Sequence, residues 1–123
     1  MSSRSPWIGR TSRRLSNYTR GRAFEYRVRN KLLASGAVYV MRAAQSKGKA
    51  DLAAFWPSKD WPSHAWPWLL QCKTGTARMS NKEKRDFVQL ALDTDTLAVL
   101  AEPGKNGRGI KLTDLHTQKE IEL

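Results

Sequence analysis

Three residues in two apolar segments have the types and spacing to do metal-assisted chemistry. Asp51 stands inside one short apolar run, and Gln71 and Lys73 stand inside another. Both runs have the length and bulky composition of buried strands. An ionised Asp or Lys is costly to bury alone, so each of these charges needs an ion pair, a metal ion or a charged ligand. The two runs are therefore the first candidates for a site.

The pairing of the two strands decides whether these side chains meet. Gln71 and Lys73 are two positions apart, so on a strand they point to one face while Cys72 points to the other. The segment 57–67 between the strands carries three prolines, which predicts a hairpin with an extended loop. In a hairpin Asp51 would lie beside Gln71 and Lys73. An acidic group can then hold Mg2+ while the lysine steadies the attacking water or a phosphate, as in a divalent-metal nuclease.

The charge of the chain is strongly positive and uneven. The formal net charge is +11 at pH 7, and Glu25 is the single acid among the first fifty residues. Such asymmetry indicates a polyanionic partner, and nucleic acid fits because arginines neutralise phosphates and release counterions. The plainer alternative for the Ser- and Arg-rich stretch before Thr19 is a disordered solubilising tail. We expect the DNA-binding residues to be Arg20, Arg22, Arg27, Arg29, Arg42, Lys47, Lys49, Lys84 and Arg85.

The remaining pattern predicts a single α/β domain that positions these residues. Apolar residues at helical spacing predict a helix over 19–35, and Ser80 with Glu83 predicts a capped helix ending near Leu92. Strands are expected over 37–42, 50–56, 68–73, 96–100 and 110–112, with a polar turn at 45–49 and a basic glycine-rich turn at 103–109. We divide the chain into a basic, flexible arm over 1–18 and a domain over 19–123.

Other functions find little support in the sequence. The single cysteine, Cys72, forms no internal disulfide and is expected to be a core residue. His64 and His116 are far apart and unclustered, which argues against zinc. No segment is long and apolar enough to span a membrane, and the first residues lack a secretory signal. We expect a cytoplasmic protein acting on DNA inside a cell, near the nucleoid or in an infected host.

Glu25 is a second candidate acid, placed beside the apolar face of the first helix. One interpretation is a simple ion pair with an arginine of that helix. The other is a second metal-binding carboxylate, because a helix packed over the strands would bring Glu25 to the same edge as Asp51 and Lys73.

The order of these motifs resembles the archaeal-type Holliday junction resolvases of the PD-(D/E)xK nuclease superfamily. The resemblance runs from about Thr19 to Leu115. Each motif alone is weak evidence for the family, and their joint order and spacing are more specific. The matching segments are Gly21–Glu25, Leu32–Arg42, Ser46–Leu52, Gln71–Lys73 and Lys84–Phe87.

This resemblance implies a restriction-endonuclease-like fold, a mixed β-sheet flanked by helices, in a homodimer. It also implies paired, Mg2+-dependent nicking of four-way DNA junctions, with Mn2+ able to substitute. By position, Glu25 and Asp51 would be metal ligands and Lys73 the catalytic lysine. Ser46 matches a catalytic serine in a mobile loop, and Arg42 matches an arginine that contacts DNA.

Gln71 departs from the family, which usually has Glu at this position. An amide oxygen can still be a Mg2+ ligand, so we keep Gln71 among the catalytic and metal-binding candidates, but it adds no charge and is no base. The enzyme is then slower, depends on Glu25 and Asp51 for its charge, or has become a binding protein. Three functions stay open: a junction-resolving endonuclease, a related nuclease that cuts duplex DNA, and a catalytically inactive DNA-binding module.

Overall fold

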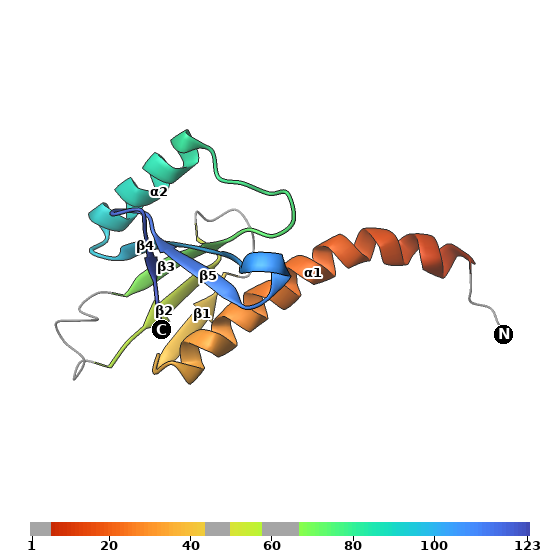
Figure 1. The fold of residues 1–123 in the computed structure, drawn as a ribbon, viewed down its shortest axis with the longest axis horizontal. Helices are drawn as coiled ribbons and strands as arrows, with labels where there is room; N and C mark the ends of the chain where they lie inside the picture. Colours follow the sequence, from red (N-terminus) through yellow and green to blue (C-terminus); the bar gives the residue numbers. More distant parts are fainter. Residues whose placement is uncertain (1–5, 44–49, 58–66) are drawn as a thin grey trace.

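The chain folds into a six-stranded mixed sheet with one long helix on each face (Figure 1). The computed structural model describes residues 6–43, 50–57 and 67–123, and for residues 6–18 it describes the backbone. In chain order the elements are α1 (Pro6–Ala34), β1 (Tyr39–Arg42), β2 (Leu52–Phe55), β3 (Trp68–Cys72), α2 (Asn81–Asp93), β4 (Leu97–Pro103), the 3-10 turn η2 (Lys105–Gly107), β5 (Ile110–Asp114) and β6 (Lys119–Ile121).

The strands lie in the sheet in the same order as in the chain, from β1 to β6. All neighbouring pairs are antiparallel except β3 and β4, which are parallel. A parallel pair needs a long crossover, and α2 supplies it between these two strands. The hairpin expected between the Asp51 and Gln71 segments is confirmed, because β2 pairs antiparallel with β3.

Helix α1 covers one face of the sheet with a single apolar stripe. Phe24, Val28 and Leu32 recur at helical spacing and are 2% exposed or less. They pack on inward-facing side chains of β1 to β5, such as Leu52 and Leu70. The N-terminal part of α1 extends past the sheet and forms the long projection in Figure 1. Glu25 follows Phe24 directly, so the packed stripe sets its position over the sheet.

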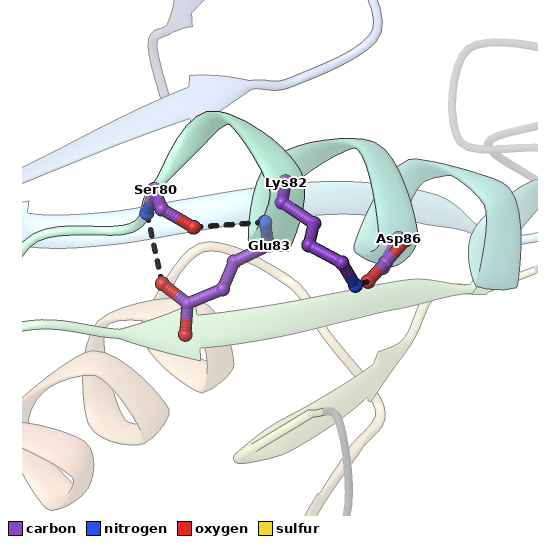
Figure 2. Close-up of polar contacts among 4 residues, drawn as sticks. All are labelled: Ser80, Lys82, Glu83 and Asp86. Atoms are coloured by element: carbon purple, nitrogen blue, oxygen red, sulfur yellow. Dashed lines mark hydrogen bonds and ion pairs between the residues drawn. The ribbon is translucent and has the colours of Figure 1, made fainter.

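Helix α2 covers the other face through Phe87 and Ala91, which pack against Ala98 and Leu100 of β4. Its start is fixed by the capping box that the sequence predicts (Figure 2). Ser80 Oγ accepts a hydrogen bond from the Glu83 N–H at 3.1 Å, and the Glu83 carboxylate accepts one from the Ser80 N–H at 2.8 Å. Two of the N–H groups that a helix start leaves unpaired are thereby satisfied.

Several predicted boundaries differ from the structure. Helix α1 begins at Pro6 rather than near Thr19, and proline suits a first helical position because its missing N–H is not needed there. The strands predicted over 96–100 and 110–112 extend to Pro103 and Asp114. The short strand β6 was not predicted. The predicted turn at 45–49 and the tip of the Trp-rich loop, including His64, lie outside the described residues.

Candidate active site

Asp51 lies at the start of β2, between the ends of two other strands. Its backbone C=O accepts a hydrogen bond from the Ala43 N–H at 2.9 Å, and its N–H donates to the Leu70 C=O at 2.8 Å. Its side-chain Oδ2 accepts a hydrogen bond from the Cys72 N–H at 2.8 Å. The carboxylate is therefore oriented by β3 itself, at an edge where three strands meet.

Gln71 and Lys73 lie beside this aspartate at the end of β3. The β2–β3 register pairs Leu52 with Leu70, so Asp51 is one step further on, next to Gln71. Leu69 packs in the core under α2, and alternation puts Gln71 and Lys73 on that same side of the sheet. Lys73 follows the last residue of β3, and its N–H donates to the Ala101 C=O of β4 at 3.0 Å.

Glu25 reaches the same region from α1 and forms an ion pair there. The Arg42 Nε–H donates to Glu25 Oε1 at 2.8 Å, with side chains 26% and 21% exposed respectively. The ion pair considered from the sequence is thus present, but its partner lies on β1 instead of on the helix. Arg42 also stands over the Tyr26 ring, 5.7 Å from the centroid. Glu25 was expected to bind a metal ion and Arg42 to contact DNA, and the structure pairs these two side chains with each other.

The Cys72 thiol lies within the electrostatic influence of both carboxylates. Burial raises the pKa of Cys72 above its ordinary value of 9.0, and the negative charges of Asp51 and Glu25 raise it further. Cys72 packs against the core under α1, as expected for a structural cysteine. A thiol with a raised pKa stays protonated at neutral pH, which agrees with a structural role for Cys72.

The oxygen donors here fit a hard divalent cation better than a softer metal. Mg2+ is usually held by one or two carboxylates, with waters and substrate phosphates completing its coordination. Glu25 and Asp51 supply two carboxylates and Gln71 an amide oxygen. Over the described residues, no group of three or more His, Cys, Asp or Glu side chains is placed to hold a metal. These oxygen donors could hold Mg2+ only with water and substrate completing its coordination.

A basic surface borders Glu25 on the exposed side of α1. The pKa of Tyr26 is lowered, first by a hydrogen bond from Arg22 and then by the charges of Arg22, Arg42 and Arg29. These three arginines therefore gather around one phenol ring at the edge of the site. Arg27 lies further round the helix, where its Nη2 donates to the Gly109 C=O at 3.4 Å.

Not all the predicted DNA-binding residues belong to this surface. Arg20 is exposed on α1 near it. Lys84 and Arg85 lie on α2, across the sheet from α1 (Figure 1), so they form a separate basic region. Ser46, Lys47 and Lys49 lie outside the described residues.

Two contacts of the site were not foreseen from the sequence. The first is the bond from the Cys72 N–H to Asp51, and the second is the position of Lys73 beside β4. Both depend on backbone geometry, which side-chain types do not reveal. Two of the tryptophans, Trp56 and Trp68, pack together in the core under α1 with ring centroids 4.8 Å apart.

The arrangement of strands and helices matches that of a solved structure. No protein-family model matches this sequence, and no curated protein sequence matches it. The solved structure is Hjc from Archaeoglobus fulgidus, a Holliday junction resolvase from an archaeal hyperthermophile. The TM-score is 0.59 at 16% sequence identity, over 84% of this chain and 79% of that one. This chain has the fold of that resolvase.

The resolvase fold confirms the α/β class, a mixed sheet flanked by helices, that the sequence predicts. Within the described ranges, no helix is long and apolar enough to cross a membrane.

Proposed function

We propose that this protein is a Mg2+-dependent endodeoxyribonuclease that resolves four-way DNA junctions by paired nicking. The observation that carries the proposal is the edge where Asp51 lies beside Gln71 and Lys73 in a resolvase fold. A strand hairpin with an acid on one strand, and an amide oxygen and a lysine two positions apart on the other, can hold a divalent cation and a phosphate together, which supports metal-assisted phosphodiester hydrolysis. Its biological role would be DNA recombination and repair in the cytoplasm.

Each residue of the edge has a distinct role in this proposal. Asp51, oriented by the Cys72 N–H, and Glu25 provide the negative charge that holds the cation. When bound, Mg2+ would polarise the scissile phosphate and make a water more acidic. Lys73 stands within reach of the same phosphate and would hold the attacking water or stabilise the negative charge that develops. Mn2+ would substitute, since it accepts the same oxygen ligands.

Because Glu25 is paired with Arg42, DNA binding would be needed to make this carboxylate available to the cation. A phosphate is a strong competitor for an arginine, because it accepts charge-assisted hydrogen bonds. We expect the DNA backbone to draw Arg42 away from Glu25, which frees the carboxylate for the cation. The arginines around Tyr26, and the basic arm before Thr19, would hold the rest of the backbone by charge.

The proposal includes a branched substrate and a dimeric enzyme. One chain offers one such edge, whereas resolving a junction needs two strands cut symmetrically, so a twofold homodimer is the simplest solution. Exposed apolar side chains at the sheet edge are available for association: Val38, Tyr39 and Met41 are 62%, 56% and 50% exposed. The basic surface has no base-reading pattern, so selectivity for junctions would come from shape.

Gln71 favours one competing function, a DNA-binding protein without nuclease activity. It brings no charge to the metal, so the site depends on two carboxylates. Gln71→Glu tests its role directly. If Gln71 is a ligand, the variant stays active with an altered Mg2+ or pH dependence, and Gln71→Ala needs more Mg2+ for half-maximal cutting. A metal response identical to wild type in both variants would make Gln71 a bystander.

The deciding experiment compares cutting of a fixed four-way junction and of linear duplex of the same sequence in Mg2+. We expect two symmetric nicks in the junction and little cutting of the duplex. Asp51→Asn and Lys73→Ala should abolish cutting while junction affinity is largely kept, with Lys119→Gln as an exposed control. Equal cutting of linear duplex would indicate a duplex nuclease, and tight junction binding without cutting in Mg2+ or Mn2+ would indicate a binding protein.

A further inference from the structure

A groove separates α2 from the outer part of the sheet, on the face opposite α1. Its volume is about 690 Å³. One wall is the side of α2 that carries Lys84 and Arg85, and the other is formed by β4 and β5, with Glu102 and Lys111. The core residue Leu100, 6% exposed, forms part of the floor. The groove is thus part of the packed fold, with charged walls over an apolar base.

The charge of the groove is positive and available to a ligand. Lys84, Arg85 and Lys111 supply three cations, against the one carboxylate of Glu102. Within the described parts of the chain, none of these cations takes part in an ion pair. Three cations converging on one groove repel each other unless an anion lies between them. The groove therefore fits a negatively charged ligand with apolar faces.

One lining residue of the groove, Glu102, lies next to the candidate active site. The parallel register pairs Cys72 with Ala101, so the next residues, Lys73 and Glu102, lie side by side at the ends of their strands. Glu102 in turn pairs with Lys111 on β5. Lys73 also helps to lower the pKa of Glu83, in the first turn of α2, after the larger effects of the Ser80 N–H. The groove therefore begins one strand away from Lys73.

We propose that this groove binds the phosphodiester backbone of the DNA strand that passes over Asp51 and Lys73. Neighbouring strands are about 4.8 Å apart, so Lys111 on β5 lies roughly 10 Å across the sheet from Lys73 on β3. Consecutive phosphates of one strand are at least about 3.4 Å apart, so the phosphate at Lys111 is at most about three nucleotides from the phosphate at Lys73. Lys111, Lys84 and Arg85 bind the backbone there, and the apolar floor contacts the sugars.

A second copy of the chain is a poorer occupant of the groove. The protein carries a formal net charge of +11, so a partner chain brings more positive charge toward three cations. A nucleic acid brings the opposite charge and gains from counterion release. Naming the strand that crosses the active site rests on the proposed function, whereas polyanion binding in the groove does not.

The first test is a pair of matched charge removals, Lys111→Gln in the groove and Lys119→Gln outside it. Both lysines are exposed on neighbouring strands, and the β5–β6 register puts Lys119 on the opposite face. Affinity for junction, duplex and single-stranded DNA is measured by fluorescence anisotropy in EDTA, so that no strand is cut. We expect Lys111→Gln to bind roughly fivefold more weakly and to lower the slope of log affinity against log salt by about 0.9.

The outcomes of this comparison are decisive in either direction. Equal affinities and slopes for Lys111→Gln and Lys119→Gln would overturn the proposal. So would a self-association constant that changes with Lys111→Gln while DNA affinity does not, because a second copy would then occupy the groove. Urea unfolding midpoints equal to wild type show that both variants fold. Lys84→Gln repeats the measurement from the other wall if Lys111→Gln is unstable.

A second test locates the bound phosphate. One neutral methylphosphonate is placed at successive positions along the strand, and its effect on the affinity of wild type and Lys111→Gln is compared. The difference between the two proteins should vanish at one position, within about three nucleotides of the phosphate that Lys73 contacts. A difference of equal size at all positions would overturn the strand path. Both tests use uncut DNA, so they remain informative if the protein proves to have no nuclease activity.

Discussion

The ion pair between Glu25 and Arg42 permits a quantitative test of how the site is held before DNA arrives. The Arg42 Nε and Glu25 Oε1 atoms are 2.8 Å apart. Two unit charges about 4 Å apart attract each other by about 1 kcal/mol in water and by about 4 kcal/mol at an effective dielectric constant of 20. Both side chains keep about a quarter of their exposure, so desolvation and ordering cancel much of the larger value. We expect a net coupling of about 1 kcal/mol.

A double-mutant cycle measures this coupling. Free energies of unfolding in urea are compared for wild type, Glu25→Gln, Arg42→Gln and the double variant. The matched control is the Lys82–Asp86 pair of α2 (Figure 2), which has the same 2.8 Å distance but side chains 77% and 43% exposed. Its coupling should be about 0.3 kcal/mol, and it should fall more in high salt.

The same cycle separates the roles of the two partners in function. Glu25→Gln should abolish cutting with little loss of junction affinity, whereas Arg42→Gln should weaken affinity first. A Glu25–Arg42 coupling no larger than that of the control pair would refute the idea that the pair holds the site. Undiminished cutting by Glu25→Gln would remove that carboxylate from the catalytic residues.

Four further predictions concern the parts of the chain around the site. Ser80→Ala should lower the free energy of unfolding by about 1 kcal/mol, because it removes one bond of the capping box; urea unfolding measures it. The bond from the Ser80 N–H lowers the pKa of Glu83 below its ordinary value of 4.5. Ionised Glu83 therefore contributes to the free energy of unfolding above about pH 4.5, and this contribution is lost as the pH falls through the pKa of Glu83 in the folded protein. Below that pKa, Glu83→Gln and wild type should have the same free energy of unfolding in urea. Native Cys72 should be alkylated much more slowly than in urea at pH 8, because its pKa is raised; an equal rate would contradict its burial. Deleting residues 1–17 should leave the fold intact and lower the salt dependence of DNA binding; an unchanged slope would show that the arm makes no phosphate contacts.

The core of the fold was predictable because local patterns and tertiary packing agree. The run around Asp51 and the run ending at Lys73 are short, bulky and apolar, as in buried strands, and the prolines between them leave a hairpin as the simplest connection. Ser80 and Glu83 predict the start of α2 because a capping box is a local interaction. Strand β6 carries no such signal, because Lys119–Ile121 is a short, polar strand at the edge of the sheet. The early start of α1 had one sequence signal, the proline at position 6, but no apolar periodicity.

The site was predictable in its residue types and less so in its contacts. Periodicity places Glu25 beside the apolar face of α1, but it does not identify Arg42 as its partner, since that contact joins two different elements. The groove by α2 depends on Glu102 and Lys111, which become neighbours through the β4–β5 register alone. Such contacts between distant segments are set by tertiary packing and leave no short-range pattern in the sequence.

The strand order of the sheet affects how the chain folds during its synthesis. Because each strand pairs with the next one in the chain, most pairings form between segments close in sequence, which favours rapid folding. The segment from Glu25 to Cys72 contains both carboxylates, Arg42 and the N–H that orients Asp51. During synthesis this half of the site can assemble while α2 is still unmade. The half that includes the groove must wait for β4 and β5, so a nascent chain would acquire its acidic cluster before its second basic surface.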